Sequence, residues 1–350
     1  MRVACLATQG QGSRDEARIV ELLAELDPVT FAFDASAKLR SATRFLRQAR
    51  AQSPDIVVME GTGVAGGLAV LLARHWFGVP FVFSSGDAVG PFVARQYLRV
   101  GPVAHLYERL LFRSCAGFIG WTPYFVGRAI HLGARRACTA PGWAAVVRST
   151  ADPAQVRREF GIPQAAIVFG IAGSLNWTDK VGYCYGLEMV RAVQATDRTD
   201  VAVLIVGDGS GRQRLEERAG GDPRIFFTGR ISSERVMDLY AAMDIASLPQ
   251  SVDGVGAYRY STKLAEYVEA GLPVVTNQIP CGYDLALAWS WRLPGEAPWD
   301  ELYVRALADL MAVCSRQDVA AHRDAIDAGL TFSRDRQRSI VSAFVRECVA

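Results

Sequence analysis

Lysine is scarce in this sequence. Only three of its 38 basic residues are lysines, at Lys38, Lys180 and Lys263, and the rest are arginines. Lysine supplies a compact ammonium on a flexible stem, whereas arginine supplies a planar fork of donors, so the two are not interchangeable. The few positions that keep lysine are therefore informative, and two of them recur in the motifs described below.

Closely spaced cysteines and long apolar runs are also absent. The seven cysteines contain no CxxC pair, and the four histidines show no ligand spacing with them. A structural zinc site and a disulfide framework are therefore not expected. No run of about 18 apolar residues could span a bilayer, and residues 1–10 lack the basic start of a signal peptide. We expect a cytoplasmic protein without a metal.

Acidic residues are sparse in the first part of the chain. Residues 1–150 hold 17 basic and 10 acidic residues, a net charge of +7, whereas the remainder holds 21 and 26, a net charge of −5. A solvated helical face explains the arginines of Pro91–Leu132, a segment that reads as helical. The alternative is a face that lies on an anionic membrane surface, on its inner side, or binds a phosphate-bearing lipid. No recognised nucleic-acid-binding module accompanies this charge.

Short apolar runs alternate with amphipathic helical patterns along the whole chain, whose 350 residues predict two domains. The alternation begins at Val3–Ala7 and restarts beyond the turn-rich stretch Thr139–Thr150, where Asp152 and Pro153 start a helix. Such alternation indicates βαβ units and parallel sheets. We therefore predict an α/β protein with two Rossmann-like, doubly wound domains, at residues 1–150 and 151–331. Ligands should bind at the carboxyl ends of the strands.

Glycines follow three predicted strands of the second half. Gly173 opens the sequence GSLNWTDK, which ends at Lys180 and precedes a helix expected at Tyr183–Ala195, while Gly207 and Gly229 follow the next two strands. A glycine lets backbone N–H groups approach an anion, and a lysine can place its ammonium against a phosphate. Each glycine is also an ordinary exit from a strand. Together they leave three neighbouring strand ends open, as a nucleotide pocket requires.

The densest pattern is YSTKLAEYVEAGLPVVT at residues 260–276. Ser261 or Thr262 can cap a helix whose first turn favours an anion. Glu266 then lies where its carboxylate can accept hydrogen bonds from two adjacent hydroxyls, such as those of a ribose. A capped surface helix accounts for the cap but not for the placement of Lys263 and Glu266.

A glycine turn also follows the first strand. It contains Gly10, Gly12 and Ser13, without the full GxGxxG spacing or a matched acidic residue. Binding of NAD at this turn is therefore a weak alternative.

The order of segments in residues 160–280 resembles the C-terminal domain of the GT-B glycosyltransferases, most closely the retaining family-4 group. The matching pieces are GSLNWTDK, VGDG, FFTGRI, LYAAMDIASLP and KLAEYVEAGLPVVT. The resemblance implies two domains that face each other across a cleft, and a helix at residues 332–350 that crosses back to the N-terminal domain. It also implies sugar transfer from a nucleotide-diphosphate sugar to a glycan or lipid-linked acceptor, without metal and with retention, as in polysaccharide biosynthesis.

The same resemblance implies roles for particular residues. Lys180 would hold the donor diphosphate beside the Gly173 loop, the turn at Gly229 would contact the base, and Glu266 would bind the ribose. The turn of Gly10, Gly12 and Ser13 would admit the acceptor. The donor-side candidates are Gly173, Ser174, Lys180, Gly207, Gly229, Arg230, Ile231, Asp253, Gly254, Gly256, Tyr258, Lys263 and Glu266.

The chain departs from the family pattern at three positions. Tyr258 stands eight residues before Glu266, where the family carries a glutamate that touches the donor sugar, and Asp253 is the candidate to replace it. Ser174 stands where many members have arginine. The fourth strand ends in FVFSSGDA, without the histidine of many members, so Asp87 is the candidate to orient the acceptor.

Cations and backbone N–H groups around the diphosphate would stabilise the charge that develops on the leaving group. The catalytic candidates are therefore Lys180 and Asp87. Two alternatives remain: a catalytically silent GT-B relative that serves as a binding or partner subunit, and a sugar-nucleotide epimerase of the same fold. The retention of Lys180 and Glu266 favours a working donor site.

Overall fold

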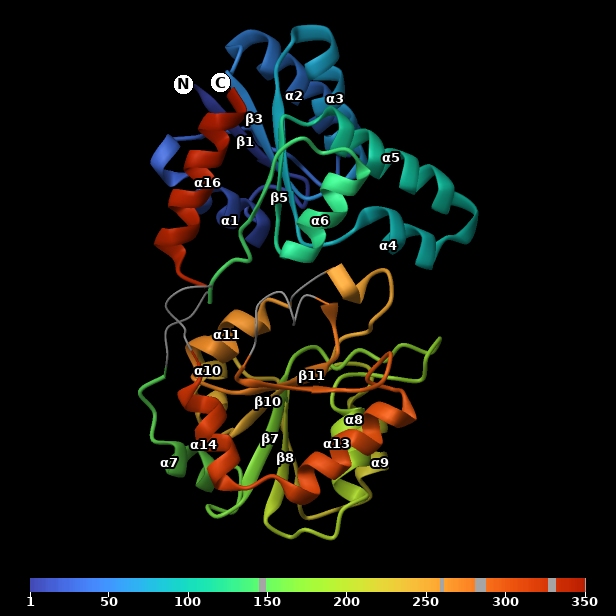
Figure 1. Cartoon of the computed structure of the whole chain (residues 1–350), viewed down its shortest axis with the longest axis vertical. Helices are drawn as coiled ribbons and strands as arrows, with labels where there is room; N and C mark the ends of the chain where they lie inside the picture. The colour runs from blue at the N-terminus through green and yellow to red at the C-terminus, as the bar shows by residue number, and fades with distance from the viewer. Residues whose placement is uncertain (145–148, 259–260, 281–287, 327–331, 350) are drawn as a thin grey trace. The chain divides into compact units, whose positions relative to one another are not determined.

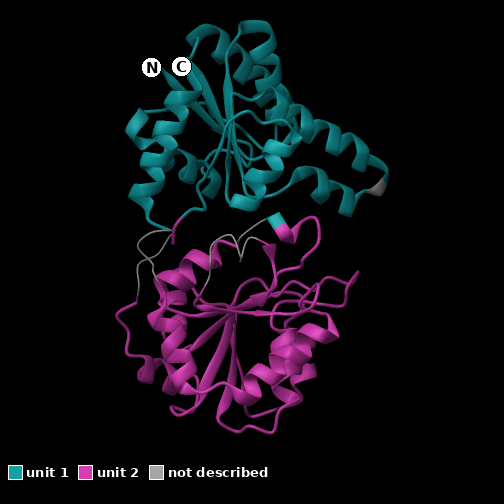
Figure 2. Cartoon of the chain, viewed as in Figure 1, with its two compact units in different colours: residues 1–142, 258–260, 330–350 teal, residues 143–257, 261–329 magenta. Residues whose placement is uncertain are grey.

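The computed structural model describes residues 1–349 apart from 145–148, 259–260, 281–287 and 327–331. The chain divides into two compact units, coloured teal and magenta in Figure 2. The first unit comprises Met1–Gly142, Tyr258–Tyr260 and Leu330–Ala350, and the second comprises Trp143–Ala257 and Ser261–Gly329. The first and longest segment of the first unit ends at Gly142, whereas the sequence placed the boundary at residue 150. Residues 145–148 of the expected linker and the expected boundary at residue 331 lie outside the described residues.

The first unit contains a parallel sheet of six described strands in the order β2-β1-β3-β4-β5-β6. Four of these strands are buried along their whole length, since helices cover both faces of such a sheet. The strands are β1 (Val3–Ala7), β2 (Val29–Thr30), β3 (Ile56–Glu60), β4 (Phe81–Ser85), β5 (Gly117–Gly120) and β6 (Ala137–Thr139). Strand β5 lies inside the segment that the sequence predicted as helical, because the short run GFIG carries no helical periodicity of its own.

The helices of the first unit include the C-terminal one. Helix α16 (Arg334–Val349) packs against α1 and against β5 and β6, so it belongs to this unit (Figure 1). Figure 1 also shows α4 and α5 side by side, extending away from the sheet. The other helices are α1 (Arg14–Leu22), η1 (Ala24–Leu26), α2 (Lys38–Gln52), α3 (Val64–Phe77), α4 (Val89–Gln96), η2 (Leu98–Val100), α5 (Gly101–Ser114) and α6 (Pro123–Leu132).

The second unit repeats the architecture with the strand order β12-β11-β10-β7-β8-β9, again parallel. This confirms the predicted α/β, doubly wound fold. The strands are β7 (Ile167–Ala172), β8 (Val201–Val206), β9 (Ile225–Gly229), β10 (Ile245–Leu248), β11 (Val274–Asn277) and β12 (Ser290–Leu293). The helices are α7 (Pro153–Glu159), α8 (Leu187–Gln194), α9 (Arg212–Ala219), η3 (Ser233–Arg235), α10 (Val236–Ala241), η4 (Gly256–Tyr258, of which Tyr258 belongs to the first unit), α11 (Lys263–Glu269), α13 (Glu301–Val313) and α14 (Arg316–Asp324).

Of two helix starts predicted from the sequence, one is confirmed and the other lies four residues later in the chain than predicted. The predicted start at Asp152 and Pro153 is confirmed, because the Asp152 carboxylate accepts a hydrogen bond from the Ala154 amide at 3.0 Å. Helix α8, expected from Tyr183, begins only at Leu187. Gly186 before it is left-handed, with φ of 96°, which interrupts the helical pattern.

Candidate functional site

The three glycines predicted to leave strand ends open lie together at the carboxyl edge of the second sheet. Gly173 follows β7, Gly207 follows β8 and Gly229 ends β9, and these strands are neighbours. The Gly207 amide donates to the Gly229 carbonyl oxygen at 3.1 Å, and the Gly173 amide donates to the carbonyl oxygen of Val206 at 2.9 Å. This is the edge at which ligands bind in doubly wound sheets.

Gly207 fits here only as glycine. Its φ is 135°, and a Cβ atom placed on it would lie 1.9 Å from the Gly173 carbonyl oxygen. Neither that backbone conformation nor that distance accommodates a side chain. The two glycines therefore form one compact piece of backbone, with no side chain of their own over the strand ends.

Lys263 brings the two densest sequence motifs together. A Cβ atom placed on Gly173 would lie 3.1 Å from Cε and 3.5 Å from Nζ of Lys263, so the lysine side chain lies against the Gly173 loop. The Ser261 hydroxyl accepts a hydrogen bond from the Lys263 amide at 3.4 Å. Thr262 makes no side-chain cap, because its own backbone is already helical. Of the two predicted caps, only Ser261 makes such a bond.

Lys180 lies on an exposed turn between β7 and α8. Thr178 and Tyr183 pair across this turn as an isolated bridge. Asp179 pairs with Arg214 at 3.2 Å, whereas the Lys180 ammonium makes no ion pair or hydrogen bond to any described residue. Its role at a diphosphate stays a prediction.

One oxygen of the Glu266 carboxylate has a protein partner. The Tyr240 hydroxyl donates to Oε2 at 2.8 Å, while Oε1 accepts no hydrogen bond from the described residues. Burial raises the pKa of Tyr240 far above its usual range, so the hydroxyl stays protonated and donates. Tyr240 orients Glu266, a role that the sequence did not reveal. Its only signal was a polar hydroxyl within the otherwise apolar stretch LYAAM.

Arg212 is a cation at this edge that the sequence analysis missed. A Cβ atom on Gly229, whose φ is 72°, would lie 2.5 Å from Nη1 of Arg212. The Arg212 Nε donates to Glu216 at 2.9 Å. Of the predicted turn residues that follow, Arg230 is exposed and Ile231 is partly buried. Arg212 thus brings a guanidinium, paired with Glu216 on its own helix, to the edge where Ser174, which is exposed, supplies no charge.

The DGVG turn is closed by its own aspartate. Oδ1 of Asp253 accepts hydrogen bonds from the amides of Val255 and Gly256, both at 2.9 Å. Gly256 has no room for a side chain, because a Cβ atom would lie 2.1 Å from the Ser251 carbonyl oxygen, and Gly254 is exposed. Asp253 therefore has a structural task in this turn, and its replacement of the missing glutamate stays a prediction.

Tyr258 packs within the first unit. Its ring stacks on Tyr124 with centroids 5.0 Å apart, and the Arg128 guanidinium lies 5.0 Å from its centroid. Its carbonyl oxygen accepts a hydrogen bond from the Thr122 hydroxyl at 2.7 Å, and Arg128 in turn pairs with buried Glu108 at 2.5 Å. The contacts of Tyr258 are thus with the first unit, whereas the other donor-side candidates belong to the second.

The predicted acceptor-side residues follow strands of the first sheet. Gly10 and Gly12 have φ of 108° and 76° in the turn after β1. Ser13 caps α1, because its hydroxyl accepts a hydrogen bond from the Glu16 amide at 3.2 Å. Asp87 is exposed after β4. Burial raises the pKa of Asp15, in the first turn of α1; Arg18 opposes that rise and Asp87 adds to it. The charges of Asp15 and Asp87 therefore interact.

Arg18 and Glu60 form a buried ion pair at the carboxyl edge of the first sheet. Nη1 of Arg18 lies 2.6 Å from Oε2 of Glu60, and the two side chains are 11% and 1% exposed. Arg18 also donates to the Ser84 hydroxyl and the Ala140 carbonyl oxygen, and lies 4.5 Å above the Trp121 ring. This pair was not predicted from the sequence. Its signal was an acid at the end of the apolar strand IVVME.

A second buried carboxylate, Glu188, lies in the first turn of α8. Its Oε2 accepts hydrogen bonds from the Tyr183 hydroxyl at 2.9 Å and from the Gly186 amide at 3.1 Å. Its Oε1 accepts a hydrogen bond from the Ser247 hydroxyl at 3.3 Å. No described cation pairs with it. Burial therefore raises the pKa of Glu188 to about 7, although the hydrogen bonds lower it. Glu188 ties the end of the Lys180 turn to strand β10.

This pKa predicts a pH-dependent stability. The folded state binds the Glu188 proton more tightly than the unfolded state, so this contribution is complete below the ordinary pKa of 4.5 and is lost as the pH rises through about 7. The loss amounts to about 3 kcal/mol. Urea unfolding across this pH range should show it in the wild type and not in Glu188→Gln. Glu269→Gln, an exposed glutamate on α11, is the control, and an identical pH slope in all three proteins would refute the assignment.

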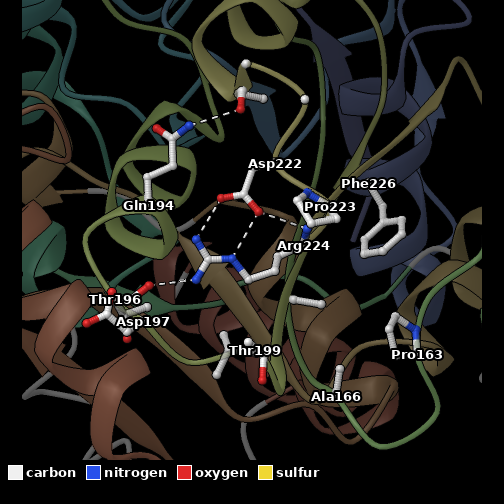
Figure 3. A pocket seen from close by; sticks show the side chains of 15 residues that line it. Pro163, Ala166, Gln194, Thr196, Asp197, Thr199, Asp222, Pro223, Arg224 and Phe226 are labelled. Carbon is white, nitrogen blue, oxygen red and sulfur yellow. Dashed lines mark hydrogen bonds and ion pairs between the residues drawn. The ribbon is translucent and has the colours of Figure 1, made fainter.

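A cavity of the second unit lies at the opposite, amino edge of its sheet. It measures about 760 Å³ and is lined by residues that precede β8 and β9. Arg224 donates two hydrogen bonds to the Asp222 carboxylate, at 2.7 and 3.0 Å, and another to the Thr196 carbonyl oxygen. These bonds are drawn as dashed lines in Figure 3. The charge of Arg224 is thus neutralised within the protein. The lining of this cavity contains none of the predicted donor-side residues.

Neither a cluster of metal ligands nor a membrane-spanning helix occurs among the described residues. No three histidine, cysteine, aspartate or glutamate side chains converge as ligands for a metal in the part of the chain that the structure describes. No helix there is long and apolar enough to cross a membrane.

Two units, each built on a parallel, doubly wound sheet, fit the GT-B class that the sequence predicted. Residues 1–143 match the family model of the glycosyl transferase 4-like domain, and residues 166–287 match that of the glycosyl transferases group 1. Together the two models span most of both units. The chain belongs to the GT-B glycosyltransferases, which confirms the resemblance found in its sequence.

Solved structures share the fold over the whole chain. HepE of Anabaena in complex with UDP is 18% identical, with a TM-score of 0.72, covering 99% of this chain and 100% of that one. Sucrose-phosphate synthase from Thermosynechococcus elongatus is 14% identical, with a TM-score of 0.68 and 99% of both chains covered. A putative UDP-N-acetylglucosamine 2-epimerase from Listeria monocytogenes is 11% identical, with a TM-score of 0.62, covering 99% and 96%. No curated protein matches the sequence.

Proposed function

We propose that this glycosyltransferase takes a sugar from a nucleoside-diphosphate sugar bound at the carboxyl edge of the second sheet. The observation that carries the proposal is the position of Lys263 against the Gly173 loop. Its ammonium lies beside the backbone of a glycine, where no side chain covers the peptide groups. Lys180 supplies further positive charge on the turn that follows β7, and the Arg212 guanidinium lies beside Gly229 from the start of α9. Glu266, oriented by Tyr240, keeps one carboxylate oxygen for a ribose hydroxyl.

The chemical step needs stabilisation of the charge that develops on the leaving diphosphate. Fixed cations and amides that face this charge lower the barrier, and this is usually the largest single contribution to catalysis. We assign that task to Lys263, Lys180 and the Gly173 loop, and we propose that no metal ion is required. In line with the family-4 resemblance we propose retention of configuration, which the anomeric form of the product would test.

The acceptor is proposed to bind the first unit, at the carboxyl edge that carries Asp87 and the Gly10 turn. We propose a glycan or lipid-linked acceptor and contact with an anionic membrane surface. Helix α5 supports the latter, because Val103, Leu106 and Leu110 are exposed along one side of it and Arg109 is exposed in its last turns. Apolar and cationic side chains on one helix suit such a surface.

The donor assignment is tested by the effect of ligands on thermal stability. A ligand that binds only the folded state raises the unfolding temperature, so a panel of UDP-, GDP- and ADP-linked sugars should yield at least one stabilising donor. UDP is the first nucleotide to test, since HepE was crystallised with it. Glu266→Gln should reduce the shift, because an amide keeps the size of the side chain but weakens its bonds to hydroxyls.

Controls separate the donor site from general effects. Glu269→Gln lies on the same helix, is exposed and should keep the full shift. Release of the nucleoside diphosphate should continue in EDTA if no metal is required. Stabilisation by no donor would contradict the donor site, and stabilisation without nucleotide release would favour the binding-subunit alternative.

A further inference from the structure

A cavity in the first unit is lined by four arginines. It measures about 530 Å³ and lies at the amino edge of the sheet, where β4 and β5 begin. Arg74 comes from the last turn of α3, Arg113 from the last turn of α5, and Arg135 and Arg136 from the connection between α6 and β6. Segments far apart in the sequence thus converge their cations on one hollow, and its remaining lining, Cys115 and Cys348 included, is uncharged.

These arginines lack the partners that other arginines of the chain have. No aspartate or glutamate in the part of the chain that the structure describes lines the cavity. Within the described residues, the guanidinium groups of Arg74, Arg113 and Arg135 make no ion pair and no hydrogen bond, whereas Arg136 donates to the backbone carbonyl of Glu347 and interacts with the Cys348 thiol. The cavity of the second unit gives the contrast, because there Asp222 neutralises Arg224.

Ordinary structural roles account for only part of this arrangement. A cation in the last turn of a helix interacts favourably with the helix dipole, which explains Arg74 and Arg113 singly. It does not explain Arg135, which follows α6 and lies outside any helix. The Arg113 side chain also packs closely against Gly133, whose φ is 113°. A Cβ atom on that glycine would lie only 2.6 Å from Cγ of Arg113.

We propose that this cavity binds a phosphate or diphosphate group. Arginine is the side chain best suited to such an anion, because its planar fork donates two parallel hydrogen bonds to phosphate oxygens. The group could be carried by a free phosphate compound or by a lipid headgroup. On a helical wheel Arg113 falls beside Leu106 and Leu110, so the exposed apolar side of α5 leads toward the cavity.

The test measures binding of inorganic pyrophosphate by calorimetry with saturating UDP present, so that the proposed donor site is filled. Arg113→Gln/Arg135→Gln should weaken pyrophosphate binding by about tenfold or more, because two charged hydrogen-bond donors are lost. Arg47→Gln/Arg50→Gln removes the same charge from exposed positions of α2 and should bind pyrophosphate as the wild type does. Circular dichroism checks that each variant is folded, and Arg74→Gln/Arg135→Gln replaces the first if it is not.

Two outcomes would overturn the proposal: no pyrophosphate binding by the wild type, or equal binding by the wild type and the cavity variant. Vesicles of phosphatidylcholine with and without phosphatidylglycerol then identify the source of the phosphate. A loss of vesicle binding in the cavity variant, beyond that in the control variant, indicates a lipid headgroup, whereas unchanged vesicle binding indicates a free phosphate compound. Binding here does not depend on sugar transfer, so a failed donor assignment would leave the result interpretable.

Discussion

Substitution of Lys263 by alanine is expected to weaken the binding of UDP by about 10- to 100-fold. The reason is that Lys263 is the cation that lies directly against the Gly173 loop, and a hydrogen bond from a charged donor contributes about 1.5–3 kcal/mol. Calorimetric titration of UDP into the wild type and the variant measures the change. Lys180→Ala belongs in the same series, because its exposed ammonium has no partner to lose among the described residues.

The third lysine of the chain provides the control. Lys38 begins α2 in the first unit and is exposed, so Lys38→Ala removes the same charge from a place with no proposed role. Its affinity for UDP should equal that of the wild type. If Lys263→Ala and Lys180→Ala both bind UDP as tightly as Lys38→Ala does, the donor site lies elsewhere.

Substitution of Arg18 by methionine is expected to destabilise the first unit by about 3–5 kcal/mol. Removal of one partner of a buried ion pair leaves the other charge buried without compensation, and Glu60 is 1% exposed. Burial already raises the pKa of Glu60, with Arg18 opposing the rise. Without Arg18 the carboxyl should protonate more readily, so the loss of stability should shrink as the pH is lowered. Urea unfolding at neutral and acidic pH measures both effects.

A double substitution shows whether the loss comes from the stranded charge. Arg18→Met/Glu60→Gln removes both charges and should recover most of the stability, since a neutral pair in place of a buried ion pair costs little. Arg50→Met, at an exposed site on α2, measures the cost of losing an arginine alone. An Arg18→Met protein as stable as Arg50→Met would contradict the assigned role of the pair.

Periodicity and glycine placement predicted most of the architecture. The strands of both sheets other than β5, β6 and β12 followed from local patterns, because each pattern depends on neighbours in the chain. The start of α7 and the open strand ends at Gly173, Gly207 and Gly229 followed in the same way. The start of α8 did not, since a single left-handed glycine at Gly186 overrides the helical pattern around it. Strand β5 was missed because a buried four-residue strand has too few residues to show a period.

The side-chain partners within the site were less predictable. Lys263 and Glu266 stood out by their positions in the sequence. Tyr240 and Arg18, in contrast, reach partners on other elements, and Arg212 lies beside Gly229 from the start of α9. Such contacts depend on how helices pack on the sheet, and a single sequence does not encode that packing in any local pattern. Tyr258 is the clearest case, because its place in the motif suggested the donor side whereas its ring packs on Tyr124.

The central claim is that a nucleoside diphosphate binds the carboxyl edge of the second sheet. Amide hydrogen exchange of the wild type with and without UDP tests it most directly, because exchange slows where a ligand restrains the backbone. The account predicts slower exchange in residues 173–182, 207–212 and 261–266, and unchanged exchange around the amino-edge cavity, at residues 196–199 and 219–224. Slower exchange confined to the amino-edge cavity, or none at the three carboxyl-edge segments, would contradict it.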